Sequence, residues 1–120
     1  DPFGDGYDAA TGRGSLAVEF VTPSVTSPGI AGPEEAAARA EQALAGHPHI
    51  RYVELITHGY VLLDIDRERL QGEIWHLDTI EQRDARERLA SAWLTERGAN
   101  HLIAADGASP AGDAREPAPG

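Results

Sequence analysis

Alternation of apolar and polar residues predicts strands in several parts of the chain. In residues 15–21, Leu16, Val18 and Phe20 alternate with small or charged residues. This period of two is typical of a half-buried strand. Proline cannot donate a hydrogen bond to a sheet, so we expect this strand to end before Pro23.

Three further strand-like runs follow, at residues 51–57, 60–65 and 70–77. Only short turns separate them, so we expect a small antiparallel meander. The two sides of the last run differ in character. Leu70, Ile74 and His76 face one way, and Gln71, Glu73, Trp75 and Leu77 face the other.

One helix is predicted to begin at Pro33. Proline suits the first helical position, and the acids that follow it, Glu34 and Glu35, meet the positive end of the helix dipole. The helix should run to about Ala45 and stop at the Gly-His-Pro sequence of residues 46–48. Its alanine-rich surface allows close packing on a sheet but buries little area.

Residues 79–94 allow two interpretations. Thr79 and Gln82 have the spacing of a helix capping box, and Ile80, Ala85, Leu89 and Trp93 could line one face of a helix. Alternatively, residues 90–95 and 100–104 form a terminal hairpin around Gly98, because glycine supplies the positive φ that such a turn requires. We prefer a short helical or irregular stretch at 79–87, followed by the hairpin.

The remaining segments are predicted to be loops. Residues 1–14 are rich in Gly and Asp, residues 22–32 are rich in turn-forming residues, and residues 106–120 have the composition of a disordered tail. The predicted fold class is therefore α/β (α+β) with a small core, in which Trp75 and Trp93 are expected to be apolar anchors. The chain has no methionine and begins in a predicted loop, so we expect it to be a fragment of a longer protein.

Composition excludes several functions. The net charge of −10 and the pI of about 4.7 predict repulsion from nucleic acid and from anionic membrane surfaces. There is no cysteine, which excludes disulfides and thiolate metal sites. No run approaches the ~20 apolar residues that a membrane-spanning helix needs. We therefore expect no nucleic-acid partner and no membrane span.

Candidate metal ligands are present, but their spacing does not form a known site. Asp1, Asp5 and Asp8 suggest a calcium loop, yet Phe3 and Gly12 stand where such a loop needs ligands, which favours a solvated loop. None of the five histidines has a recognised metal spacing, so capping and surface roles are favoured for them: His47, His49, His58, His76 and His101.

Hydroxyl side chains offer a second candidate chemistry. Ser24, Thr26 and Ser27 are possible nucleophiles, but no Gly-x-Ser-x-Gly elbow surrounds them, and such residues commonly form turns. Glu19 ends an apolar run directly before this loop. It is a candidate for orienting a neighbouring group, and an exposed strand position explains it equally well.

Four short stretches carry a resemblance to a known family. They are EFVTPSVTSPG at residues 19–29, HPHIRYVEL at 47–55, GYVLLD at 59–64 and LQGEIW at 70–75. In this order and spacing they resemble the carboxy-terminal part of a PhoD-like alkaline phosphatase (alkaline phosphatase D family), over roughly residues 14–104. The resemblance implies a partial metallophosphatase-type sandwich across residues 15–105: a strand, one helix, then antiparallel strands and a terminal hairpin.

The resemblance also implies a function. It points to the carboxy-terminal segment of a metal-dependent phosphatase or phosphodiesterase that hydrolyses phosphate esters. The family is expected to use Ca²⁺ and Fe³⁺ and to be periplasmic or extracellular. Its Gly-Asp-x-His motif does not occur in this chain. We therefore predict no cofactor, no metal ligand and no catalytic residue for the chain alone, and we expect the chain alone to be inactive.

The resemblance further implies partners and a set of residues near the active site. The expected partners are the rest of the parent catalytic domain and a phosphate-ester substrate. The residues expected to lie near the active site share one loop and the strand before it: Glu19, Thr22, Ser24, Thr26 and Ser27. The alternative is a stand-alone acidic module with a binding or structural role and no catalysis.

Overall fold

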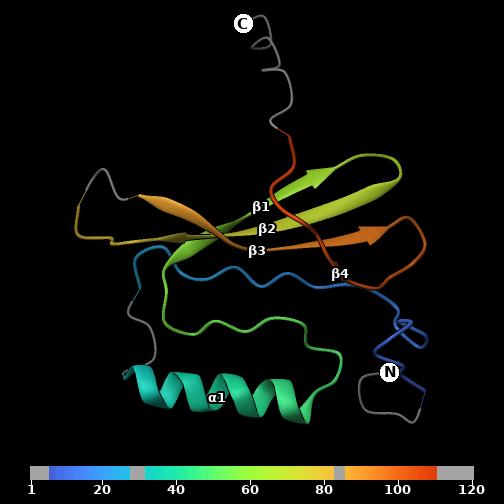
Figure 1. The fold of residues 1–120 in the computed structure, drawn as a ribbon, viewed down its shortest axis with the longest axis horizontal. Coiled ribbons are helices and arrows are strands. Elements are labelled where there is room, and N and C mark those ends of the chain that lie inside the picture. Colours follow the sequence, from blue (N-terminus) through green and yellow to red (C-terminus); the bar gives the residue numbers. More distant parts are fainter. Residues whose placement is uncertain (1–5, 28–31, 83–85, 111–120) are drawn as a thin grey trace, which may run out of the picture.

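The computed structural model describes residues 6–27, 32–82 and 86–110 of the chain. Within these residues it contains one helix, α1 (Pro33–Gly46), and four strands: β1 (Gly59–Ile65), β2 (Arg69–Leu77), β3 (Glu87–Glu96) and β4 (Ile103–Ala104). The strands form one antiparallel sheet in the order β1-β2-β3-β4 (Figure 1). This helix and antiparallel sheet confirm the predicted α/β (α+β) class, and β1 and β2 are the strands predicted at 60–65 and 70–77 of the meander.

Helix α1 matches its prediction closely. It begins with proline in its first turn, carries Glu34 and Glu35 there, and ends at Gly46, with His47 as the C-cap. An ion pair between Arg39 and Glu35, 2.6 Å long, spans one turn of its exposed surface. Ala36 is its only buried residue. The helix therefore covers its neighbours with small side chains and contributes little buried apolar area.

The sheet is built from two hairpins whose turns have clear local causes. Between β1 and β2, the Asp66 carboxylate accepts hydrogen bonds from the backbone amides of Glu68 (2.7 Å) and Arg69 (2.9 Å). Between β3 and β4, Gly98 adopts a φ of +82°, as the sequence predicted. The pairing of β2 with β3 shifts register between Ile74 and Trp75, which is a β-bulge.

The predicted strands at 15–21 and 51–57 are wrong for this structure. Both segments are extended, but neither pairs with a strand within the described residues. A strand requires a neighbour for its backbone groups, and alternation alone does not supply one. The two segments instead run between the sheet and α1 (Figure 1). The ring of Phe20 packs against Gly72 of β2, where an added Cβ would lie 2.2 Å from the ring.

The ambiguity at residues 79–94 is resolved in favour of a strand. Leu89 and Trp93 lie in β3, so the alternative helical face is wrong, and Ala85 lies outside the described residues. Residues 78–82 have no helix, in line with the preferred irregular stretch. The strand β3 nevertheless begins at Glu87, three residues before the predicted hairpin, because β2 is long enough to pair with it.

The chain after β4 crosses the sheet. The amide of Ala105 donates to the carbonyl of Ala92 (2.9 Å), and Gly107 and Ser109 contact side chains of β2. The predicted tail 106–120 thus has its first residues against the sheet, and residues 111–120 lie outside the described part. Among the described residues, no helix is long and apolar enough to cross a membrane.

Candidate functional site

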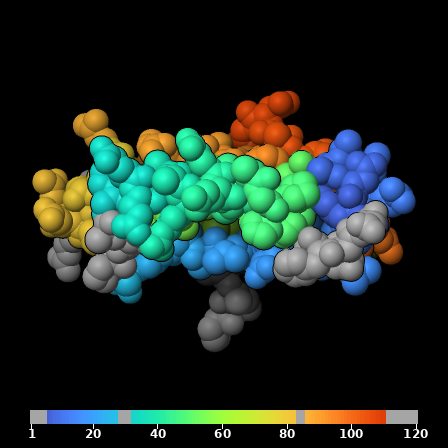
Figure 2. Space-filling view, turned by 90° about the horizontal axis from the view of Figure 1, so that it is seen from below, coloured from blue at the N-terminus to red at the C-terminus, as the bar shows by residue number. Residues whose placement is uncertain are grey.

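A cavity of about 1020 Å³ lies between the sheet and the two extended segments. We call the sheet surface that lines it the cavity face; it carries Val61, Ile74, His76 and Trp93. Residues 15–24 and 49–58 form the opposite wall. Seen from the helix side, α1 and the residues after it cover this part of the molecule, with the early extended segment along one edge (Figure 2). The two segments predicted as strands, residues 15–21 and 51–57, therefore form the wall of the cavity opposite the sheet.

Four of the five residues predicted to lie near an active site line this cavity. They are Glu19, Thr22, Ser24 and Ser27, whereas Thr26 is not among the lining residues. Because the four come from the end of the extended segment and the loop after it, they gather at one end of the cavity wall. Their role in an active site stays a prediction.

The hydroxyl groups of this loop already have local partners. The amide of Ser27 donates to the Ser24 hydroxyl oxygen (2.6 Å), and the Thr22 hydroxyl donates to the carbonyl of Pro23 (3.3 Å). These contacts are those of a Ser/Thr turn. The structure therefore supports the turn interpretation of Ser24 over that of a nucleophile, because no histidine or carboxylate within the described residues is bonded to its hydroxyl.

His58 joins the loop to the sheet. Its Nε2 lies 3.0 Å from the carbonyl oxygen of Ser27, thirty-one positions away in sequence. The residue stands directly before β1, and its own carbonyl accepts a hydrogen bond from the amide of Leu77 at the end of β2 (2.9 Å). This contact ties the predicted active-site loop to the rigid end of a hairpin.

A polar cluster lies deeper in the cavity, around His76. The imidazole is 2% exposed, and its Nε2 lies 3.3 Å from the hydroxyl of Tyr52. Its Nδ1 is buried and has no hydrogen-bond partner within the described residues. Burial lowers the pKa of His76, Arg88 lowers it further, and Glu54 opposes both effects. Burial also raises the pKa of the Tyr52 hydroxyl, so both groups are held neutral around pH 7.

Glu54 lies on the same segment as Tyr52, two positions further on. Burial alone would raise the pKa of its carboxyl, but hydrogen bonds from the amides of Ile56 (2.8 Å) and Thr57 (3.2 Å) stabilise the charged form, and the net result is a lowered pKa. The carboxylate therefore serves as the anchor of the turn that leads into His58.

The far end of the cavity carries a positive charge. The Arg51 guanidinium donates to the carbonyl of Ala9 and lies 3.4 Å from Nε2 of His101. His101 in turn packs against Gly12, where the φ of +71° and the lack of space both exclude a side chain. The arginine is thus held between the amino-terminal loop and the turn before β4.

The described residues contain no group of three or more His, Cys, Asp or Glu side chains that could hold a metal ion. Asp8 is used within its own loop, where it accepts from the amide of Ala10 (2.9 Å) and the hydroxyl of Thr11 (2.8 Å). Asp1 and Asp5 lie outside the described residues. His47 and His49 pack edge to face with each other. The calcium-loop and histidine-ligand interpretations therefore gain no support among the described residues.

Sequence analysis missed the polar residues of the extended segment at 51–57. Arg51, Tyr52 and Glu54 were interpreted only as strand positions, yet each lines the cavity. A signal was present: Tyr52 and Glu54 alternate in the period of a strand and follow two histidines. What the sequence could not supply was the contact with His76, because that contact depends on how the segment lies against β2.

A helix, an antiparallel sheet and a cavity bordered by a turn-rich loop place the chain in the α+β class. Comparison with protein families identifies it further: the model of PhoD-like phosphatases matches residues 3–74, which is more than half of the chain. The chain belongs to the PhoD-like phosphatase family. No curated protein and no solved structure matches it.

Proposed function

We propose that this chain is the carboxy-terminal segment of the catalytic domain of a metal-dependent phosphatase or phosphodiesterase that hydrolyses phosphate esters. The observation that carries the proposal is the family match over residues 3–74, which includes the loop at the end of the cavity, α1, β1 and the first part of β2. The chain's role in that domain is to position the loop at 22–27 and to provide the sheet behind it.

Incomplete packing on both sides of the cavity supports the proposal that a further part of the domain is needed. Leu16 is 88% exposed and Val21 is 78% exposed, although both belong to a segment with strand alternation. The buried atoms Nδ1 of His76 and Nε1 of Trp93 have no partner within the described residues. A buried polar atom without a partner costs about 1–3 kcal/mol, so extended segments of the parent domain would stabilise this face.

The loop at 22–27 can orient a substrate but cannot generate a nucleophile. Its short polar side chains and backbone amides are neutral hydrogen-bond donors, suitable for phosphoryl oxygens. The Ser24 hydroxyl oxygen accepts from the amide of Ser27, which fixes the shape of the loop. We propose that Glu19, Thr22, Thr26 and Ser27 likewise lie near the active site without taking part in the chemical step.

PhoD-like phosphatases depend on metal ions, and we propose Ca²⁺ and Fe³⁺ for the parent enzyme. Hard cations need several oxygen or nitrogen ligands at close quarters, and the described residues bring no such group together. The described residues alone therefore do not fit these ions, and we assign the ligands to the rest of the parent domain. We propose a periplasmic or extracellular location on the same family grounds.

The test compares the 120-residue chain with the full-length parent protein on chromogenic phosphate monoesters and diesters, with and without added calcium and iron. The account expects metal-dependent turnover by the parent and none above background by the chain. Chelator-sensitive turnover by the chain alone would overturn the assignment of the ligands. An inactive parent would instead favour the alternative, an acidic module with a binding or structural role.

A further inference from the structure

The position of His58 is fixed by two contacts of the backbone on either side of it. Its carbonyl accepts a hydrogen bond from the amide of Leu77 (2.9 Å), which closes the end of the β1–β2 ladder. The next residue, Gly59, approaches β2 so closely that an added Cβ would lie 2.1 Å from the carbonyl oxygen of Trp75. The Cα of His58 therefore has little freedom to move relative to the sheet.

The turn before His58 is fixed as well. A single oxygen of Glu54 accepts from the amides of Ile56 (2.8 Å) and Thr57 (3.2 Å). This side-chain cap bends the chain out of the extended segment and aims the following residue toward the loop at 22–27. Glu54, Ile56 and Thr57 together thus orient the backbone that carries the His58 imidazole.

The contact that this imidazole makes has a defined direction. Nε2 of His58 lies 3.0 Å from the carbonyl oxygen of Ser27, and a carbonyl can only accept. Nε2 must therefore carry the proton. The amide of the same Ser27 donates to the Ser24 hydroxyl oxygen (2.6 Å). Both backbone groups of Ser27 are therefore held, the amide by Ser24 and the carbonyl by His58.

We propose that His58 is a positioning residue for the phosphate-ester site: it holds the loop at 22–27 in place through the carbonyl of Ser27. The inference rests on the proposed function, since it assigns that loop to the site. His58 is not a catalytic residue in this account, because it acts through the loop and touches no reacting atom. Side-chain amide donors of similar reach can replace it, and apolar side chains cannot.

The test uses three variants, His58→Ala, His58→Gln and, as a matched control, His47→Ala. His47 is the exposed C-cap residue of α1, and within the described part of the chain it makes no hydrogen bond to the loop at 22–27. In the 120-residue chain, exchange of the Ser27 amide, which donates to the Ser24 hydroxyl oxygen, should rise about tenfold in H58A, the effect of losing one hydrogen bond, and return to within about threefold of wild type in H58Q. Nitrogen NMR should show a protonated Nε2 in wild type.

The second arm measures kcat/KM per folded molecule in the full-length protein. We expect a fall of about tenfold in H58A, recovery to within about threefold in H58Q, and no change in H47A. If amide exchange in the loop were unchanged in H58A, the claim that His58 holds the loop would be wrong. A loosened loop with unchanged kcat/KM, or equal losses in H58A and H58Q, would overturn the positioning role. An inactive wild-type parent protein would refute the proposed function. The amide-exchange experiment would then still show whether His58 holds the loop.

Discussion

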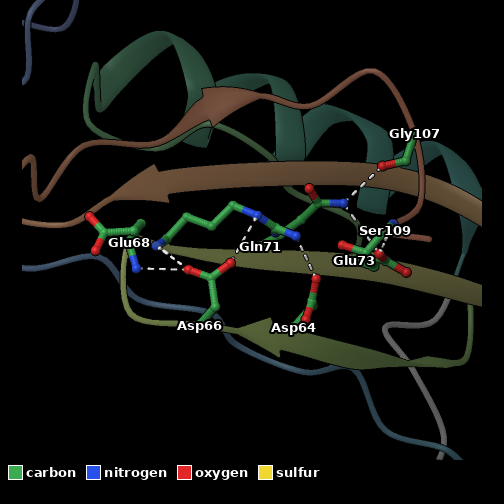
Figure 3. A network of polar contacts seen from close by, with 8 residues as sticks. Asp64, Asp66, Glu68, Gln71, Glu73, Gly107 and Ser109 are labelled. Carbon is green, nitrogen blue, oxygen red and sulfur yellow. Dashed lines mark hydrogen bonds and ion pairs between the residues drawn. The ribbon is translucent and has the colours of Figure 1, made fainter. Parts of the chain in front are cut away.

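Each face of β2 buries a polar side chain equally deeply, Glu73 on one and His76 on the other, but the two side chains differ in how many hydrogen bonds they make. On the outer face, which points away from α1, the Glu73 carboxylate is 2% exposed and accepts from Nε2 of Gln71 (3.2 Å), the indole of Trp75 (3.0 Å) and the amide of Ser109. Gln71 also donates to the carbonyl of Gly107 (2.9 Å). Figure 3 shows Gln71 and Glu73 of β2 pointing toward Gly107 and Ser109 of the chain that follows β4.

On the cavity face, His76 is also 2% exposed, yet only its contact with Tyr52 is made and its Nδ1 has no partner within the described residues. On the outer face, Gly107 and Ser109 from the chain after β4 bond to Gln71 and Glu73, whereas Nη1 of Arg69 and Oγ of Ser109 have no partner within the described residues. The cavity face is bordered by segments that pair with no strand within the described residues. The difference shows that burial alone does not tell whether a surface has all its packing partners. Hydrogen bonding of the buried polar groups is the better indicator.

The largest expected effect is the loss of Glu73. Replacing it with alanine leaves the donors of Gln71, Trp75 and Ser109 without their acceptor, so the free energy of unfolding should fall by about 2–4 kcal/mol. The control is Glu87→Ala, which removes an exposed carboxylate bonded to the Tyr60 hydroxyl (2.8 Å) and should cost less than about 1 kcal/mol. Urea unfolding of both variants gives the comparison. Equal losses would show that the outer face is not held by its network.

A smaller loss is expected for Trp75→Phe. This variant keeps an aromatic ring stacked on Tyr60, whose centroid lies 6.5 Å from that of the indole, but removes the donor to Glu73. We expect about 1–2 kcal/mol of destabilisation, from one hydrogen bond to a charged group and the smaller ring. Urea unfolding measures it, and turnover per folded molecule in the parent should be unchanged. A loss as large as that of Glu73→Ala would contradict a shared network.

Substitution on the cavity face should change stability much less. Replacing His76 with leucine removes a buried group that is only half satisfied, so stability at pH 7 should change by less than about 1 kcal/mol. Its pKa is lowered in the folded chain by burial and by Arg88, so the unfolded chain binds more protons as the pH falls below the ordinary value of 6.5. Wild type should therefore lose stability from that pH downward.

The His76→Leu variant should lack this part of the pH dependence. The measurement is urea unfolding of both proteins between about pH 7 and pH 5, taken as a difference so that the carboxyl groups cancel. A pH dependence that is the same in both proteins would show that His76 titrates freely in the folded chain.

The smallest effect is expected on the unpaired segment. Leu16 is 88% exposed, so Leu16→Ser should change the stability of the chain by less than about 0.5 kcal/mol. In the full-length protein, where we propose that this segment is covered, the same change should lower the melting temperature clearly. An equal, negligible effect in both proteins would argue that nothing covers the segment.

Local sequence signals predicted the elements that depend on neighbours in sequence. The start of α1 follows from Pro33 and the acids after it, and the two faces of β2 follow from the alternation of Gln71 and Glu73 with Ile74 and His76. The Gly98 turn follows from the conformational freedom of glycine. These features are determined within a few residues, which is why pattern alone located them.

Features that depend on distant partners could not be predicted in this way. The segments at 15–21 and 51–57 have the alternation of strands, but pairing depends on a neighbour that the pattern does not reveal. The Glu73 network needs Ser109, thirty-six positions away, whose segment has the composition of a tail. The candidate site shows the same limit: the loop at 22–27 was located, but its contact with His58 and the Tyr52–His76 pair were not.

The central claim is that the two segments that border the cavity, residues 15–21 and 51–57, lack strand partners among the described residues and receive them from the rest of a phosphatase domain. Amide hydrogen exchange of the 120-residue chain and of the full-length parent tests it directly. The account predicts rapid exchange at residues 16–22 and 51–55 in the chain, strong protection of both segments in the parent, and protected β2 amides in both proteins. Protection of the two segments in the chain alone, or rapid exchange in the parent, would contradict it.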